Sequence, residues 1–217
     1  MNMSPYGGLH VLADDDPRWS RDPVEQASEA LRGGARVIQL RAKHADDRET
    51  LAWAERIRVM TLEVDARFVM NDRFDLALAA GADAVHLGQD DLAPADLPAT
   101  ARKRLAIGCS THDLEQAHAA RASDIDYLAF GPVFDTGSVA TPYTPRGLAA
   151  LREIVAAAGA LPVVAIGGIE ESNLAKVLGC GVAGIAVISA LAGAEKPADA
   201  TRRLVEHPAW SDPRRSA

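Results

Sequence analysis

Eight short apolar segments, each followed by a stretch with a helical pattern, predict an α/β protein of the (β/α)8 TIM-barrel class. The segments are mostly continuous apolar runs, as expected for parallel strands that are buried on both faces. Aromatic residues make up only 5% of the chain, while Ala and Gly are abundant, which favours close packing of helices on a sheet. A doubly wound open sheet is the structural alternative, but no GxGxxG motif follows the first apolar segment.

The expected strands are the apolar runs, which are separated along the chain by polar or glycine-containing turns. They cover residues 9–13, 37–40, 68–70, 84–87, 106–109, 127–130, 163–166 and 185–188.

Helices are expected between these strands. The first begins at Pro23 after Asp22, a residue type that often caps helix N-termini, and runs to Gly33. A long amphipathic helix follows from Asp46 to about Val64. The remaining helical segments are expected between strands three and four, near 94–104, at 113–122, 148–158 and around 172–178, and in a last region from 189 onward.

Length and composition limit the classes of protein that the chain can represent. Its 217 residues are 48% hydrophobic, enough for one domain over 1–217, with a core at about 8–206 and a loosely ordered tail at 207–217. The net charge of −7 argues against binding to nucleic acid. No apolar run approaches the roughly 20 residues of a membrane span, and no signal peptide is evident.

The two cysteines, Cys109 and Cys180, are far apart and match no metal-binding spacing. Reduced thiols in a cytoplasmic protein are therefore expected. The sequence leaves the oligomeric state open, a homo-oligomer included.

Polar residues and glycines follow the strands at the points where the strands end. In a parallel barrel these carboxyl ends meet at one rim, where ligands bind. The residues concerned are Arg41, Lys43, Asn71, Asp72, Gln89, Asp91, Ser110, Thr111, Thr136, Ser138, Gly167, Gly168, Ile188 and Ser189. Cations, carboxylates, hydroxyls and exposed backbone amides together predict a site for small phosphorylated substrates and a divalent metal.

Each of these residues also has a purely structural interpretation. Asp72 could cap the helix that follows it, Asp91 could be a solvated loop residue, and Arg41 could pair with a structural acid. The joint placement of Asp72 and Asp91 on neighbouring strand ends favours a shared Mg²⁺, which takes few carboxylates together with water and phosphate oxygens. Arg41 and Lys43, beside one strand end, favour an anion.

Gly167 and Gly168 could form a simple turn. Their place after the seventh of eight strands favours phosphate binding through backbone N–H groups, as in other barrels. A side chain at position 168 is then expected to lie where the phosphate approaches.

The histidines are predicted to be structural. His86 lies within a strand and is expected to be a satisfied interior residue, His112 is expected to cap the following helix, and His118 is expected at the surface. The sequence contains no Ser/His/Asp or Cys/His arrangement at a credible catalytic spacing.

Several of these motifs together resemble the thiamine-phosphate synthase family over almost the whole chain. The matching segments are QLRAK at 39–43, NDR at 71–73, HLGQDD at 86–91, STH at 110–112, FGPVFDT at 130–136 and IGGI at 166–169. The resemblance implies a TIM barrel that joins a hydroxymethylpyrimidine diphosphate to a thiazole phosphate and releases pyrophosphate.

The resemblance also implies roles for single residues. The residues implied to hold the pyrimidine diphosphate are Gln39, Arg41, Lys43, Asn71 and Ser110, of which Arg41, Lys43 and Ser110 are expected to act in catalysis. The implied Mg²⁺ ligands are Asp72 and Asp91. The implied thiazole-phosphate site consists of Thr136, Ser138, Gly168, Ile188 and Ser189.

The chain departs from the family in its sixth loop. The family usually has a Lys where this chain has Val139, and often a Pro where it has Asp135. That Lys would contact the diphosphate, and Arg146 is the nearby basic residue that could replace it.

Two other functions stay open. The related thiazole tautomerases are expected to carry a His after the Phe-Gly of the sixth strand, where this chain has Pro132. A barrel that only binds thiazole phosphate is the third interpretation, and Val139 is the observation that favours it.

Overall fold

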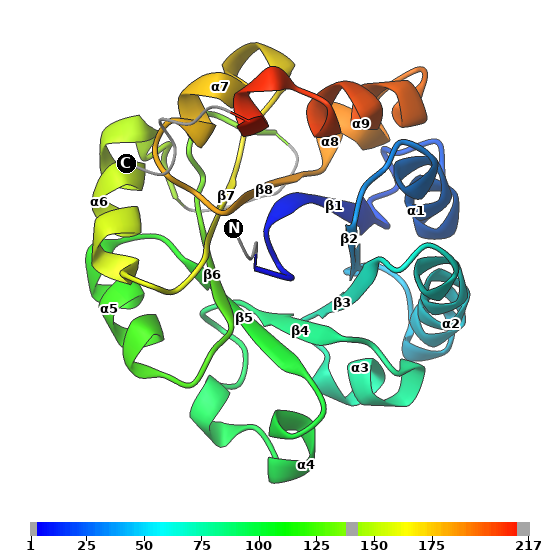
Figure 1. The fold of residues 1–217 in the computed structure, drawn as a ribbon. Coiled ribbons are helices and arrows are strands. Elements are labelled where there is room, and N and C mark those ends of the chain that lie inside the picture. Colours follow the sequence, from blue (N-terminus) through cyan, green and yellow to red (C-terminus); the bar gives the residue numbers. More distant parts are fainter. Residues whose placement is uncertain (1–3, 138–142, 212–217) are drawn as a thin grey trace.

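The computed structural model describes residues 4–137 and 143–211, and these form a closed barrel of eight parallel strands (Figure 1). This confirms the predicted (β/α)8 fold. The strands, which pair in chain order and close through β1 and β8, are β1 (Gly8–Asp14), β2 (Val37–Arg41), β3 (Arg67–Asn71), β4 (Ala84–Leu87), β5 (Ala106–Thr111), β6 (Tyr127–Phe130), β7 (Val163–Ile166) and β8 (Gly184–Val187).

Helices surround the barrel and cover the outer face of its strands, while the inner face lines the barrel interior (Figure 1). The α-helices are α1 (Pro23–Arg32), α2 (Asp47–Glu63), α3 (Phe74–Ala80), α4 (Ala99–Arg102), α5 (Leu114–Ala122), α6 (Gly147–Ala158), α7 (Glu171–Leu178), α8 (Ser189–Ala192) and α9 (Pro197–Val205). Within the described residues, no helix has the length and apolar character needed to cross a membrane.

The first helix begins as its sequence predicts. The Asp22 carboxylate accepts a hydrogen bond from the Glu25 backbone N–H at 2.7 Å, and the Glu25 side chain accepts one from the Asp22 N–H at 3.3 Å. This reciprocal capping satisfies two N–H groups that the helix itself cannot. Pro23 occupies the first turn, where its missing N–H is not needed.

The prediction of one continuous helix near 94–104 is wrong. A 3₁₀ turn, Pro94–Asp96, is followed by the four-residue α4. Leu97 and Pro98 between them are extended, with ψ near 140°. Proline disfavours the helical region for the residue before it and has no N–H to continue the hydrogen-bond ladder, so the helix is interrupted there.

Side chains alternate between the two sides of the barrel wall. On β2, Ile38 and Leu40 pack outward in the layer between barrel and helices, whereas Val37 belongs to the interior cluster. Gln39 and Arg41 follow Val37 at steps of two and line the pocket at the top of the barrel. The interior cluster includes small residues such as Ala129 and Ala186, which leave space for that pocket.

Part of the tail expected after residue 206 lies within the described residues. Residues Pro208–Ser211 form a second 3₁₀ turn, and the Trp210 indole N–H donates to the Leu204 carbonyl at 2.7 Å. Residues 212–217 of the predicted tail lie outside the described residues.

The close packing of Gly33 against α9 can be tested by substitution. A Cβ at Gly33 would lie 2.5 Å from the Ala198 carbonyl oxygen and would collide with the Thr201 side chain of α9. We expect Gly33→Ala to lower the free energy of unfolding by about 1–3 kcal/mol, as overpacking does elsewhere, measured by urea denaturation. Gly179→Ala is the matched control, because Gly179 also ends a helix in αR geometry and its nearest contact is 3.2 Å. Equal effects would contradict the packing argument.

Candidate functional site

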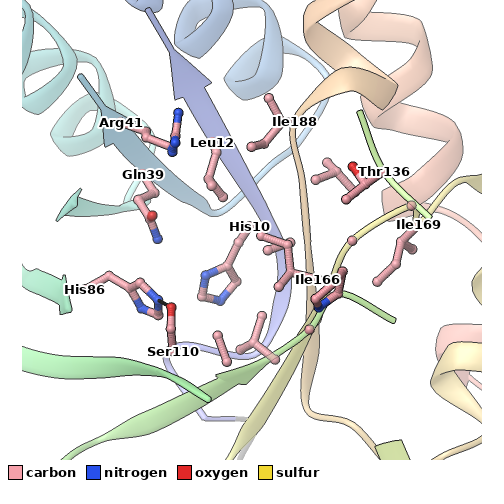
Figure 2. A pocket seen from close by; sticks show the side chains of 18 of the residues that line it. His10, Leu12, Gln39, Arg41, His86, Ser110, Thr136, Ile166, Ile169 and Ile188 are labelled. Atoms are coloured by element: carbon pink, nitrogen blue, oxygen red, sulfur yellow. Dashed lines mark hydrogen bonds between the residues drawn. The ribbon is translucent and has the colours of Figure 1, made fainter. Parts of the chain in front are cut away.

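A pocket opens at the carboxyl ends of the strands, and most of the predicted site residues line it (Figure 2). It encloses about 1000 Å³, counting its open mouth. The predicted residues in its wall are Gln39, Arg41, Asn71, Ser110, Thr136, Gly168, Ile188 and Ser189. Ser138 and Val139 lie outside the described residues.

Arg41 forms an ion pair with a fully buried carboxylate. Its guanidinium donates to Asp14 Oδ2 at 2.5 Å, and the Asp14 Oδ1 accepts from the Trp19 indole N–H at 3.0 Å. Gln26 bonds both the N–H and the carbonyl of Asp14. The structural pairing considered for Arg41 therefore exists, and it fixes the guanidinium at the pocket wall. The expected first strand, 9–13, ended before Asp14, and the sequence did not predict this role.

The loop after β2 is held by the neighbouring acid Asp15. Its carboxylate accepts hydrogen bonds from the backbone N–H groups of Lys43, His44 and Ala45, each at 2.8 Å. Three bonds to one carboxylate order this short loop and direct Lys43 across the rim. The Lys43 ammonium there forms an ion pair with Asp72.

Asp72 does not cap the helix that follows it. The N-cap position of α3 is Arg73, which has no side-chain capping bond. Asp72 instead has φ of +62°, a left-handed conformation that Asp tolerates better than most residues. Its N–H donates to the His86 carbonyl at 2.7 Å, which ties the end of β3 to β4.

The Asp91 carboxylate lies against that of Asp72. Burial raises the pKa of Asp91, and the hydrogen bond and like charge of Asp72 raise it further, while the Gly88 N–H bond at 2.6 Å lowers it. Two carboxyl groups that repel each other at a partly buried rim are a natural place for a cation.

The donor set fits Mg²⁺ better than a tightly caged metal. Among the described residues, no group of three or more His, Cys, Asp or Glu side chains could hold a metal ion together. Mg²⁺ commonly takes one or two carboxylates and fills its other positions with water and substrate phosphate oxygens. Asp72 and Asp91 meet that requirement.

The floor of the pocket is built from buried aromatic and histidine side chains. His86 Nδ1 lies 3.0 Å from the Tyr127 hydroxyl and His86 Nε2 lies 3.0 Å from Ser110 Oγ. His10 Nε2 lies 2.8 Å from the Tyr6 carbonyl oxygen. His86 is thus the satisfied interior residue that its strand position predicts. His10 and Tyr127 were missed, because apolar strands gave no sign that they border a pocket.

Both floor histidines are neutral at physiological pH. Burial lowers the pKa of His10 to about 4, and it lowers the pKa of His86 to about 4 with a smaller contribution from His10. A floor of neutral imidazoles and aromatic side chains suits an uncharged aromatic ring, while the charged groups Arg41 and Lys43 lie nearer the strand ends.

Gly167 and Gly168 have positive φ values of 100° and 62°, which glycine adopts without strain. A Cβ on Gly167 would lie 2.6 Å from Pro132 Cα, and one on Gly168 would lie 2.8 Å from Phe134 Cβ. The expected direction of a side chain at position 168 is therefore wrong, since it would collide with the sixth loop. The close approach still leaves the backbone of Gly168 in the pocket wall.

His112 does not cap the helix after β5, because Asp113 does so, accepting from the Gln116 N–H at 2.8 Å. His112 Nδ1 lies 2.6 Å from the Gly131 carbonyl oxygen, and its ring stacks on Tyr143 at 3.7 Å. The Arg146 guanidinium carbon lies 5.6 Å from the centroid of the Tyr143 ring. Arg146 Nε is buried without a hydrogen-bond partner within residues 4–137 and 143–211.

Comparison with known proteins identifies relatives of the whole chain. The family model described as thiamine monophosphate synthase matches residues 9–191. A thiamine-phosphate synthase of Chlorobium phaeovibrioides is 45% identical over 202 residues, covering 91% of this chain and 92% of that protein. One of Methanoculleus marisnigri is 43% identical over 90% of this chain and 92% of that protein.

A solved structure, a thiamine phosphate pyrophosphorylase from Pyrococcus furiosus, superimposes with a TM-score of 0.82. It is 42% identical and covers 94% of this chain and 96% of that chain. A Bacteroides thetaiotaomicron structure of the same description has a TM-score of 0.64 at 19% identity, and shows the shared fold alone.

The buried pair of Asp14 and Arg41 generates a prediction about stability. Asp14→Ala leaves the guanidinium in a largely buried position without its counter-charge. We expect a loss of about 3 kcal/mol in the free energy of unfolding, because breaking a buried ion pair is costly. The control is Asp199→Ala, which removes an exposed pair with Arg202 and should cost less than about 0.5 kcal/mol. Thermal or urea unfolding with similar losses in both variants would contradict this role for Asp14.

Proposed function

The chain belongs to the thiamine monophosphate synthase family, and we propose that it joins hydroxymethylpyrimidine diphosphate to thiazole phosphate at the rim of the barrel. The reaction is a transfer of the pyrimidine methylene group from diphosphate oxygen to thiazole nitrogen. The observation that carries the proposal is a cluster of charged groups beside a pocket with an uncharged floor. Arg41 lines the pocket, and the Lys43–Asp72 ion pair, with Asp91 against Asp72, follows the ends of neighbouring strands.

The two parts of the pyrimidine substrate are proposed to bind in different places, the ring at the inner wall and the diphosphate at the rim. We infer that Gln39, Asn71 and Ser110 bind the pyrimidine part, since they line the inner wall. Arg41 and Lys43 hold the diphosphate, which is dianionic or more and needs cations at hydrogen-bonding distance. Arg41 is pre-oriented by Asp14, so little conformational freedom is lost when the diphosphate binds.

The Lys43–Asp72 ion pair bears on metal binding. Asp72 and Asp91 are the residues that would hold Mg²⁺, which, when bound, neutralises charge on the diphosphate oxygens. A cation held by these carboxylates would compete with Lys43 for Asp72, and the Lys43 ammonium would then be available to the diphosphate. Lys43 is about 44% exposed along its side chain, so it has room to move toward the diphosphate.

Bond cleavage places negative charge on the departing diphosphate and positive charge on the pyrimidine methylene. Arg41 and Lys43 stabilise the first charge more strongly as it develops, which lowers the barrier. The thiazole nitrogen then donates its lone pair to the methylene carbon, forming the new C–N bond as pyrophosphate leaves. No proton is removed from the nucleophile, and this agrees with the neutral, low-pKa histidines of the floor.

The thiazole phosphate is proposed to lie across the pocket, beside the ends of β7 and β8. Thr136, Gly168, Ile188 and Ser189 line that side, and Ser138 is included from the resemblance. The backbone of Gly168 can approach a phosphate closely, because glycine has no side chain to intervene. Arg146 stays the proposed substitute for the family's Lys in the sixth loop.

The cellular location proposed is the cytoplasm. Cys109 and Cys180 are both unpaired and buried, as expected for a protein kept in a reducing compartment.

The direct test of the function is a product assay. Purified protein is incubated with both phosphorylated substrates and Mg²⁺, and thiamine phosphate and pyrophosphate are measured together. Equal amounts of the two products are expected. Isomerised thiazole without thiamine phosphate would favour the tautomerase, and binding without turnover would favour a non-catalytic barrel.

If Asp91 helps to hold Mg²⁺, activity should depend on Mg²⁺ and on Asp91, but not on its neighbour Asp90. EDTA is expected to abolish turnover, and Asp91→Asn to lower kcat/KM by about 10²-fold or more, equivalent to roughly 3 kcal/mol of transition-state stabilisation. Asp90→Asn is the matched control, because Asp90 is exposed and adjacent in sequence, and its activity should change little. Full activity of Asp91→Asn, or of the wild type in EDTA, would exclude Asp91 as a metal ligand.

A further inference from the structure

Three polar side chains form a continuous hydrogen-bonded chain in the pocket floor. The Tyr127 hydroxyl lies 3.0 Å from His86 Nδ1, and the opposite ring nitrogen, Nε2, lies 3.0 Å from Ser110 Oγ. Figure 2 shows His86 directed toward Ser110 at the pocket wall. Ser110 lies nearest the substrate in the proposed function, and Tyr127 lies at the far end of the chain.

Tyr127 is held in one position by its surroundings. Its ring stacks on Tyr6 at 5.1 Å and on His86 at 5.5 Å, and His10 meets it edge-on at 5.6 Å. The hydroxyl end lies over Gly108 on β5, where a Cβ would be only 2.5 Å from the phenolic oxygen. Glycine at position 108 is thus what allows the hydroxyl to reach His86.

The chain of hydrogen bonds can be arranged in two ways around a neutral imidazole, which donates from one nitrogen and accepts at the other. In the first, Tyr127 donates to Nδ1, and Nε2–H donates to Ser110. In the second, Nδ1–H donates to Tyr127, and Ser110 donates to Nε2. The two differ in what Ser110 presents to the pocket: its O–H hydrogen in the first, and only oxygen lone pairs in the second.

The surroundings of Tyr127 favour the first arrangement. Its side chain is 1% exposed, and in the part of the chain that the structure describes the hydroxyl has no hydrogen-bond partner besides His86. In the second arrangement the buried phenolic hydrogen would have no acceptor, which is costly. In the first arrangement the Tyr127 and His86 hydrogens both have acceptors, and the Ser110 hydrogen is left for the substrate.

We propose that Tyr127 is a positioning residue for the reaction: its hydroxyl fixes the Nε2–H tautomer of His86 and so makes Ser110 a hydrogen-bond donor to an acceptor atom of the pyrimidine diphosphate. The inference rests on the proposed function, because it requires Ser110 to contact that substrate. Tyr127 itself acts through His86 and Ser110 rather than on the reacting atoms.

The tautomer can be measured without any substrate. In protein labelled with ¹⁵N-histidine, the His86 signals are assigned by their absence in His86→Gln. We expect a protonated Nε2 and an unprotonated Nδ1 in the wild type at neutral pH, and a mixture of both tautomers in Tyr127→Phe. A protonated Nδ1 in the wild type, or an unchanged tautomer in Tyr127→Phe, would overturn the inference.

A double-mutant cycle tests the consequence for activity. Tyr127→Phe is expected to lower kcat/KM for the pyrimidine diphosphate by about 10-fold, with the KM for thiazole phosphate unchanged. In a Ser110→Ala background, the same change should have no further effect. Tyr6→Phe is the matched control, because Tyr6 stacks on Tyr127 but its hydroxyl contacts the Asp83 carbonyl, and its activity should stay within about twofold of wild type.

The outcomes separate this inference from the function beneath it. A loss in Ser110→Ala that simply multiplies with the loss in Tyr127→Phe would overturn the positioning role and leave the proposed function intact. Full activity in Ser110→Ala would overturn the role of Ser110 in the proposed function, and the inference with it.

Discussion

Closure of eight parallel strands into a barrel is the constraint on which the rest of the molecule depends. Because the strands run in one direction, all their carboxyl ends meet at one rim, and because side chains alternate, every second residue faces inward. Residues that are more than a hundred positions apart, such as Gln39 and Gly168, thereby line one pocket. Small interior residues such as Ala129 and Ala186 keep that pocket open.

Charge at the rim is balanced before any ligand binds. The fully buried Asp14 holds Arg41, Lys43 lies against Asp72, and Asp91 is left beside Asp72 with a raised pKa. Each cation is therefore paired with a carboxylate in the folded protein. A metal-bound diphosphate would rearrange the contacts of Lys43, Asp72 and Asp91. The floor beneath is neutral, since His10 and His86 lose the charged form through burial.

The sequence predicted those features that depend on local pattern. Short apolar runs located all eight strands. Ser110, expected at a strand end, lies near the end of β5 and lines the pocket. The features that failed depend on distant neighbours. The role of Asp14, which follows the expected first strand, was not predicted because its partner Arg41 is 27 positions away. Tyr127 looked like core, because only the barrel brings it to His86. The direction of a side chain at Gly168 could not be known without the sixth loop beside it.

In the proposed function, a metal-bound diphosphate occupies the rim between Arg41, Lys43 and the two carboxylates. The most direct measurement is a crystal structure with pyrophosphate and Mn²⁺ in place of Mg²⁺, in which anomalous scattering locates the metal. We expect one strong peak between Asp72 and Asp91, in contact with pyrophosphate oxygens that also contact Arg41 and Lys43. A metal peak elsewhere, or pyrophosphate bound away from this rim, would contradict it.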